Sequence, residues 1–274
     1  MKDLERNVEL VSLKENVNLN LEFEDLLKLN PNEEDLNRIF EELEFSVLKK
    51  EKEEERPLKN SKYDTVLTKS ELNTWISKIK KSKAFAIDTE TDSVETVSAK
   101  LLGISLSVKE NEGCYIPIGH NYDKCPEQLS IDYIIKTLGP VIEENQDKAV
   151  GQNLKFDIPI LMRHGIKITN FLEDTMLMSY VLNSTATRHG MDRLASYYLN
   201  YTTTKYTDVT GTASKQINFS EVKLDIATNY AAEDADITLR LFNTLSTLLK
   251  GQPVQEQLLN CLLYTSDAAD DDAC

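Results

Sequence analysis

The segment Ala84-Phe85-Ala86-Ile87-Asp88-Thr89-Glu90-Thr91-Asp92 decides the fold of this 274-residue chain. Its first half holds small and apolar residues without glycine or proline, which predicts a short buried strand. Asp88 and Glu90 follow at alternate positions, so both carboxylates are expected on one face of that strand. Two like charges at the end of a buried strand are unfavourable unless a cation neutralises them. The segment therefore indicates a strand that ends in a candidate cation site.

The residues around this strand predict an α/β domain with a mixed sheet. Residues 101–108 and 113–118 are apolar runs joined by the turn-like Lys109-Glu110-Asn111-Glu112. Short connections place them with the Phe85 strand in an antiparallel meander. Strands and helices alternate afterwards, which is typical of a sheet with additional parallel strands and flanking helices. Further strands are expected at residues 63–67, on an edge of the sheet, and at residues 149–151.

Helices are expected where apolar residues recur at spacings of three and four. Thr68-Lys69-Ser70-Glu71 is a capping box, and one helical face after it carries Leu72, Trp75, Ile76 and Ile79. A helix after Ser130 is expected to end at Gly139-Pro140. Another runs through Leu161, with Pro159 in its first turn. The remaining helices are expected over residues 176–182, 191–199 and 220–249.

The composition is typical of a globular protein that carries no membrane span. The hydrophobic share is 41% and the charged share 28%, which are ordinary values for such proteins. A run of about 18 apolar residues, the length of a membrane helix, is absent from the sequence. The N-terminal Met1-Lys2-Asp3-Leu4-Glu5-Arg6 lacks the apolar core of a signal peptide. We therefore expect a cytoplasmic location and no membrane partner.

Residues 261–274 look like the translation of a sequencing-library transposon adapter, and we leave them out of the expected fold. The protein is then expected to continue beyond residue 260. Their removal leaves Cys114 and Cys125, which imply no disulfide framework. It also removes four Asp residues, which changes the net charge from −15 to −11. This charge argues against a broad basic face for duplex nucleic acid, but it does not exclude a nuclease whose acidic cleft holds divalent metal, so composition alone leaves the partner open.

Two segments besides the Phe85 strand carry candidate site residues. The Asp88/Glu90 spacing is weak evidence alone, because Asp3-Leu4-Glu5 has the same pattern. What distinguishes Asp88 and Glu90 is the apolar strand immediately before them. In Gly151-Gln152-Asn153-Leu154-Lys155-Phe156-Asp157, a strand runs into a helix and Asp157 lies at the helix start. Asp157 or Asn153 would then either belong to a functional site or merely cap that helix.

The long C-terminal helix supplies the third candidate. Its expected buried stripe places Tyr230 and Asp234 one turn apart among apolar residues, namely Ile226, Ile237, Leu241, Leu245 and Leu248. An aspartate in such a stripe is rarely left unpaired. The alternative to a site is that Asp234 caps a neighbouring helix or pairs with Arg188 or Arg193.

Together these segments offer four carboxylates and a tyrosine. Carboxylates without a Cys or His cluster favour hard cations, Mg²⁺ or Mn²⁺, over zinc. Two such ions form the clamp used for in-line displacement at phosphorus, in which one activates water and the other stabilises the leaving oxygen. A tyrosine hydroxyl beside the water would help to aim it.

The three motifs Asp88-Thr89-Glu90, Asn153-x-x-Phe156-Asp157 and Tyr230-x-x-x-Asp234 resemble, in that order, those of the DEDD exonucleases of the tyrosine variety. The text around them resembles the proofreading 3′–5′ exonuclease domains of the family A, or bacterial DNA polymerase I, proteins. Segments that carry this likeness are Val150–Lys155, Arg188-His189-Gly190-Met191-Asp192 and Tyr230–Asp236. The resemblance implies a ribonuclease-H-like fold and metal-dependent removal of nucleotides from a single-stranded or frayed DNA 3′ end.

The resemblance also implies roles for single residues. Asp88, Glu90 and Asp234 would hold one Mg²⁺ or Mn²⁺, and Asp88 would bridge to a second ion held by Asp157, partly through water. Tyr230 and Glu90 would orient the attacking water. The implied substrate contacts are Val94 and Phe219 against the terminal bases, with Gln152, Asn153, Lys155, Arg188 and His189 near the strand. All five motif residues are present, which favours an active enzyme.

The resemblance further implies a domain order. Residues 1–48 are similar to the tail after a flap-nuclease domain, 49–61 form a charged linker, and 62–250 form the exonuclease domain. Residues 251–260 would begin a polymerase domain that acts in cis and is missing here, and 261–274 are the adapter-like segment. The alternatives are an RNA exonuclease similar to ribonuclease D and a catalytically silent nucleic-acid-binding module.

Overall fold

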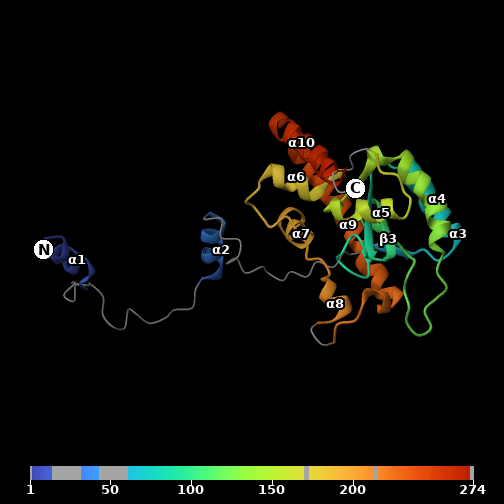
Figure 1. The fold of residues 1–274 in the computed structure, drawn as a ribbon, viewed down its shortest axis with the longest axis horizontal. Helices are drawn as coiled ribbons and strands as arrows, with labels where there is room; N and C mark the ends of the chain where they lie inside the picture. The colour runs from blue at the N-terminus through green and yellow to red at the C-terminus, as the bar shows by residue number, and fades with distance from the viewer. Residues whose placement is uncertain (1, 14–31, 43–60, 170–172, 213–214, 272–274) are drawn as a thin grey trace. The chain divides into compact units, whose positions relative to one another are not determined.

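A computed structural model describes residues 2–13, 32–42, 61–169, 173–212 and 215–271 (Figure 1). The chain divides into two units, Met1–Lys52 and Glu53–Cys274. The first unit contains α1 (Lys2–Val11) and α2 (Glu33–Glu42). The Asp35 amide donates to Asn32 Oδ1 at 3.4 Å, which caps the start of α2. Residues 49–60 of the expected charged linker lie outside the described residues.

The predicted buried strand is β2 (Phe85–Thr91), which lies inside a six-stranded sheet of the second unit. The strand order is β1 (Lys62–Thr65), β4 (Glu112–Pro117), β3 (Leu101–Lys109), β2, β5 (Ala149–Gly151) and β6 (Glu173–Asp174). The pairs β2–β3 and β3–β4 are antiparallel, whereas β1–β4, β2–β5 and β5–β6 are parallel. The mixed sheet with an antiparallel meander and an edge strand at β1 is therefore confirmed.

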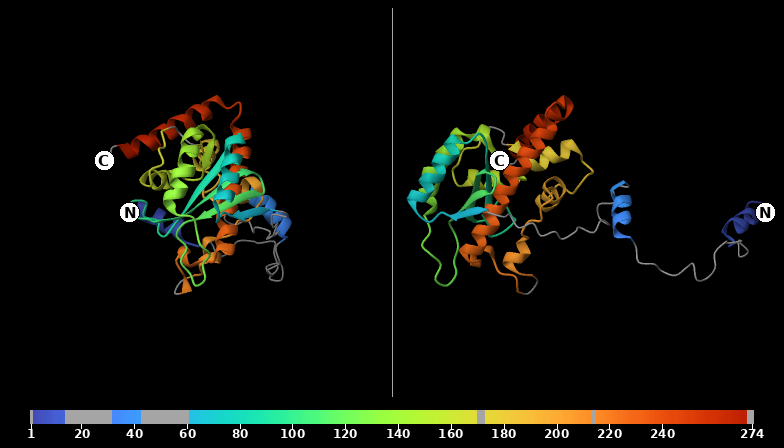
Figure 2. Two further views of the ribbon diagram at one scale, coloured as in Figure 1. Left: turned by 90° about the vertical axis from the view of Figure 1, so that its right-hand side faces the viewer. Right: turned by 180° about the vertical axis from the view of Figure 1, so that it is seen from behind.

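One face of the sheet packs against α3 (Lys69–Lys81), α4 (Ile131–Glu144) and α5 (Leu154–Arg163). Phe85 and Ile87 of β2 point into this apolar cluster. Helix α3 begins at the predicted capping box, in which Thr68 and Glu71 accept from each other's backbone amides. These helices cover the sheet as seen in Figures 1 and 2.

The opposite face packs against α9 (Leu224–Leu249), because Ala86, between Phe85 and Ile87, clusters with Ala235 and Leu239 of that helix. Small residues on both surfaces permit a close approach. A Cβ atom at Gly113 would lie only 2.8 Å from the Ala232 carbonyl oxygen. The close contact brings the middle of α9 against β2, where the two candidate acidic segments meet.

Helix α4 corrects one expectation, because it continues through Gly139-Pro140 to Glu144. An internal proline costs about 3 kcal/mol of helix stability. Val141 and Ile142 are 5% and 0% exposed, and burying two such side chains contributes roughly 1.5–3 kcal/mol each. Packing of the second half of α4 therefore outweighs the proline. Pro159 is likewise internal to α5, one turn later than expected.

The long helix α9 begins four residues later than the expected Ser220. Residues Phe219–Glu221 form a separate 3-10 turn, η4, and Val222 is extended. This break lets Phe219, Val222 and Leu224 enter one apolar cluster, although residues two apart do not share a helix face. Ile226 and Leu248, expected in the buried stripe, are 44% and 45% exposed. Only the central part of α9 is enclosed, by the sheet on one side and by α6 (Thr175–Leu182) and α7 (Met191–Leu199) on the other.

The remaining elements belong to the second unit. They are η2 (Gln146–Lys148), α6 (Thr175–Leu182), α7 (Met191–Leu199), α8 (Tyr206–Thr210) and α10 (Pro253–Asp271). Residues 261–271, which the sequence led us to leave out, form the end of α10, and Leu262 and Leu263 pack on the cluster of α6, α7 and α9. In the described part of the chain, none of the helices combines the length and the apolar character that crossing a bilayer requires.

Candidate functional site

Three carboxylates meet where α9 crosses β2. One oxygen atom each from Asp88, Glu90 and Asp234 lie within 4.8 Å of one another. Asp88 and Glu90 project from the same face of β2, as the alternation of the strand requires. Glu90 and Asp234 are 8% and 7% exposed. The expected pairing of two acidic segments at the end of a buried strand is therefore present.

Short side chains on β3 make room for this cluster. Gly103 lies opposite Glu90 and Ser105 lies opposite Asp88 in the antiparallel register. Ser105 Oγ donates to Asp88 Oδ2 at 3.4 Å. A Cβ atom at Gly103 would overlap the Tyr115 ring, at 2.3 Å. A larger side chain at Gly103 would displace that ring, so glycine is required for the packing next to Glu90.

Asp157 approaches the same cluster from the free edge of β2. Strand β5 pairs with β2 only at Phe85 and Ala86, so the Thr89 amide beyond them has no strand partner on that side. Asp157 Oδ1 accepts from this amide at 3.0 Å and from Thr89 Oγ1 at 2.5 Å. Asp157 is therefore fixed beside the cluster rather than used as a helix cap, and Asn153 makes no side-chain cap bond either.

Asp174 is a positioning residue that the sequence did not reveal. Its carboxylate accepts from the backbone amides of Asn153 at 3.1 Å, Leu154 at 2.8 Å and Met176 at 2.8 Å. It therefore caps α6 and also satisfies the first amides of α5. Because Asp157 lies in the first turn of α5, Asp174 helps to fix its position. The only sequence signal was an acidic residue two positions before the expected 176–182 helix.

The clustered carboxylates resist ionisation. Burial raises the pKa of Asp88 to about 7. Burial, and then the neighbouring charge of Asp88, raise the pKa of Glu90, of Asp157 and of Asp234 well above their ordinary values. The charges acting on Asp234 come from acidic neighbours, which gives no support to the alternative of a structural pair with an arginine. Such a group is stabilised either by protons or by a cation.

Tyr230 lies one turn before Asp234 on α9, as expected, and its phenol interacts electrostatically with the Asp234 carboxylate. Burial, followed by the charges of Asp234, Glu90 and Asp88, raises the pKa of Tyr230 far above its ordinary value. The phenol therefore stays protonated at neutral pH. It is a hydrogen-bond donor at the edge of the carboxylate cluster.

Phe219 is completely buried, so its ring does not face solvent. The ring of Tyr206, from α8, stacks over it with centroids 6.0 Å apart and planes at 19°. Tyr206 also meets the Tyr230 ring edge-on at 6.2 Å, and burial, followed by the charge of Glu90, raises the pKa of Tyr206. Tyr206 is 41% exposed. Tyr206, rather than Phe219, presents an aromatic surface beside the carboxylates, and the short helix that carries it has no periodic signal in the sequence.

The other predicted substrate contacts fall into two groups. Val94, Lys155 and Arg188 are exposed, so they are available to a ligand. Gln152 and His189 are instead engaged with the protein: Gln152 Nε2 donates to the His189 carbonyl at 2.9 Å. The His189 ring nitrogens lie 2.9 Å from Ser179 Oγ and 3.1 Å from the Ser184 carbonyl. These two residues hold the segment that carries Arg188.

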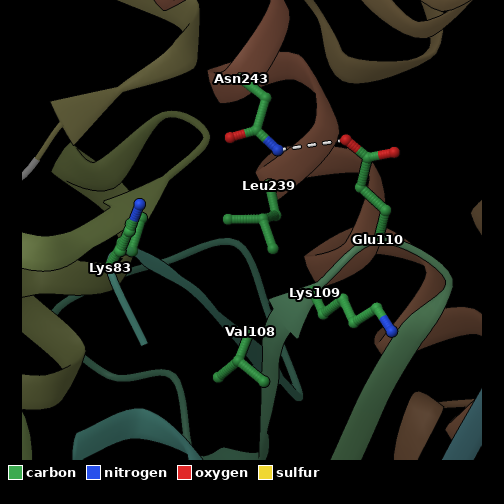
Figure 3. Close-up of a pocket in the computed structure, with 7 residues that line it drawn as sticks. Lys83, Val108, Lys109, Glu110, Leu239 and Asn243 are labelled. Atoms are coloured by element: carbon green, nitrogen blue, oxygen red, sulfur yellow. Dashed lines mark hydrogen bonds between the residues drawn. The ribbon is translucent and has the colours of Figure 1, made fainter. Parts of the chain in front are cut away.

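A pocket at the other end of β2 is separate from this site (Figure 3). It is lined by Lys83, Ala84, Val108, Lys109, Glu110, Leu239 and Asn243. Asn243 Nδ2 donates to Glu110 Oε1 at 3.2 Å across its wall. Lys83 precedes Glu90 by seven residues, which is roughly 23 Å along a strand. The pocket therefore does not belong to the carboxylate cluster.

Comparison with known proteins links this geometry to a family. Residues 63–250 match the family model described as a 3′–5′ exonuclease. DNA polymerase I of Pseudomonas aeruginosa is 37% identical over 265 residues, which cover 92% of this chain and 29% of that protein. DNA polymerase I of Borreliella burgdorferi is 43% identical over 191 residues, which cover 70% of this chain and 20% of that protein. The chain thus spans less than a third of the length of these relatives.

Solved structures support the fold. Escherichia coli RNase D, described as an exoribonuclease involved in structured RNA processing, matches with a TM-score of 0.54 at 16% identity. The match covers 75% of this chain and 50% of that one. At this identity the likeness concerns the fold alone, and it confirms the predicted ribonuclease-H-like class.

Proposed function

The chain belongs to the 3′–5′ exonuclease domain family of bacterial DNA polymerase I, and from this premise we propose that it removes nucleotides stepwise from the 3′ end of DNA. Membership makes it a nuclease, and the triad of Asp88 with the buried Glu90 and Asp234 is the observation that carries the proposal. The preferred substrate is a single-stranded or frayed 3′ end. In the complete protein this end would come from a polymerase domain in cis, as in the DNA polymerase I relatives.

The donor set fits divalent metal. Carboxylate oxygens suit hard cations such as Mg²⁺ or Mn²⁺, and the raised carboxylate pKa values indicate a cluster that lacks a compensating positive charge. We assign one ion to Asp88, Glu90 and Asp234, and a second to Asp88 and Asp157. When bound, two such ions lower the pKa of an attacking water and stabilise negative charge on the leaving oxygen.

The protein groups supply orientation. Tyr230 stays protonated and donates a hydrogen bond, so it aims the attacking water without removing its proton. Glu90, whose carboxylate lies in the same cluster, accepts a hydrogen bond from the same water. Thr89 fixes Asp157 through two hydrogen bonds, which keeps that carboxylate in place before substrate arrives. A preorganised site of this kind avoids reorganisation during the reaction.

The strand would lie between an aromatic and an apolar surface. The exposed face of Tyr206 would stack on the terminal base, and Phe219 would support it from below. Stacking on an aromatic ring accepts any base, as a proofreading site requires. Val94 would contact the terminal bases, and Lys155 and Arg188 would bind backbone phosphates. Gln152, Asn153 and His189 would shape the segments that carry these groups.

A primer-shortening assay tests the proposal. A 5′-labelled primer with a 3′ mismatch, annealed to its template, is incubated with Mg²⁺ or with EDTA, and the expected result is stepwise shortening with Mg²⁺ alone. Asp234→Asn should abolish shortening, whereas Asp225→Asn, an exposed position on the same helix, should retain it. Faster cleavage of a matched RNA strand would favour the ribonuclease D-like alternative. Binding without cleavage would favour the silent module.

A further inference from the structure

The loop formed by residues 92–100 joins β2 to β3 directly after the carboxylates. Its ends are closed by two hydrogen bonds, from the Asp92 amide to the Lys100 carbonyl at 3.1 Å and from the Lys100 amide to Asp92 Oδ1 at 2.7 Å. Inside the loop, the Glu95 carbonyl accepts from the Ser98 and Ala99 amides, and Ser93 Oγ accepts from the Glu95 amide at 3.3 Å. The carbonyls of Thr96, Val97 and Ala99 accept from a side chain outside the loop.

Arg163, the last residue of α5, makes those contacts. Its Nη1 donates to the Thr96 carbonyl at 2.7 Å and to the Val97 carbonyl, and its Nη2 donates to the Ala99 carbonyl. One planar guanidinium thus satisfies three backbone acceptors that no strand partner reaches, and charge-assisted bonds of this kind are stronger than neutral ones. Asn218 Nδ2 donates to the Asp92 carbonyl at 3.1 Å from the other side.

The anchored loop carries two apolar side chains that face solvent. Val94 and Val97 are 85% and 86% exposed. A single exposed valine needs no explanation, but here three hydrogen bonds from another element hold the backbone that presents both. Because α5 also carries Asp157, Arg163 fixes the loop relative to the helix that supplies a site carboxylate.

We propose that Arg163 is a positioning residue that holds Val94 and Val97 as a fixed apolar ridge against which the terminal nucleotides pack. This inference rests on the proposed function, since it names how the same site receives its strand. The loop is ordered during folding, so binding does not carry the cost of ordering it. Arg163 itself touches neither the carboxylates nor the strand.

The first test measures the anchor without any activity. Hydrogen exchange of the 92–100 amides is compared between the wild-type chain, Arg163→Ala and the control Met162→Ala, whose side chain is 51% exposed on the same helix. Arg163→Ala should speed exchange in this loop while leaving β2 and the unfolding midpoint nearly unchanged. Unaltered exchange in the loop would overturn the inference.

The second test measures binding and turnover with a labelled single-stranded DNA oligonucleotide. Arg163→Ala should raise the Kd in Ca²⁺, and the KM in Mg²⁺, about threefold to tenfold, because the loop is then ordered only on binding. The kcat should stay close to that of the wild type, and Arg163→Lys should recover part of the affinity. A lower kcat with unchanged Kd and KM would contradict positioning.

A double-mutant cycle tests whether Arg163 affects DNA binding through Val94 and Val97 or through a general loss of structure. In the background of Val94→Ala and Val97→Ala, Arg163→Ala should change the Kd little, since contacting residues are coupled rather than additive. Full additivity would refute the inference even if the nuclease is active. Absence of cleavage by the wild-type chain would refute the proposed function instead, while the Kd cycle and the exchange data would still decide the role of Arg163.

Discussion

In a preparation freed of metal by chelation, the free energy of unfolding is expected to fall as the pH rises from 5 to 8. The cause is the cluster of buried carboxylates, whose protonated forms are favoured in the folded chain. Burial raises the pKa of Asp88 from its ordinary 3.8 to about 7, and the pKa values of Glu90, Asp157 and Asp234 are also raised. Unfolding returns all four groups to water.

The sign follows from proton linkage. Between pH 4 and 7 the unfolded chain has lost the Asp88 proton and the folded chain retains it, so the folded state binds more protons and stability falls with pH. One unit of pKa difference corresponds to about 1.4 kcal/mol. Asp88 alone therefore removes about 2 kcal/mol between pH 5 and 7, where the folded form becomes half ionised. The other three carboxylates act in the same direction.

Urea unfolding followed by fluorescence measures this change. Trp75 is the single tryptophan and is 2% exposed, so its emission reports loss of the core between α3 and the sheet. Unfolding midpoints in EDTA at several pH values give the slope. Saturating Mg²⁺ should restore stability most at pH 8, where the cluster is most ionised, and least at pH 5, where protons compete with the ion.

Asp88→Asn is the control that assigns the slope. This variant should be less pH-dependent in EDTA and should respond less to Mg²⁺, because one charge of the cluster is gone. Stability in EDTA that is flat or rises between pH 5 and 8 would refute the reasoning. An equal Mg²⁺ response at pH 5 and 8 would do the same.

Three further variants address single contacts. Tyr230→Phe should lower the cleavage rate by about 10²-fold, the lower end for a lost acid–base or water-positioning group, with DNA affinity unchanged; equal loss of affinity would make Tyr230 structural. Asp174→Ala should destabilise the fold by about 1–3 kcal/mol, because three buried amides lose their acceptor, whereas Asp132→Ala at an exposed position of α4 should have almost no effect on urea unfolding. Tyr206→Ala should weaken binding of single-stranded DNA by about 1–3 kcal/mol, the range for lost base stacking. Tyr133→Ala, in α4 on the opposite face of the sheet, should leave this binding unchanged.

The sequence predicted the sheet well because its signals are local. The strand alternation, the capping box at Thr68 and the short turn at residues 109–112 each lie within a few neighbours. The helix end at Gly139-Pro140 was wrong because its outcome depends on how Val141 and Ile142 pack against distant residues. The start of α9 was wrong for the same reason, since Val222 breaks the helix in order to enter a cluster assembled from other segments.

The site shows the same difference between residues with local sequence signals and residues whose position depends on distant contacts. Asp88, Glu90 and Asp234 were found because each lies in a regular element whose period indicates a buried face, and the structure brings their oxygens within 4.8 Å. Tyr206 was missed because it lies in a five-residue helix with no period to read. Its role depends on stacking over a residue from another segment.

The same difference applies to the surfaces proposed to bind DNA. The carboxylates are held by regular structure, so their positions follow from strand and helix geometry. Two of the surfaces proposed to receive the strand are instead irregular segments, and each is held by a side chain from a different element: the 92–100 loop by Arg163, and the segment carrying Arg188 by Gln152. Substitutions at such anchors should therefore alter affinity for DNA before they alter the chemical step.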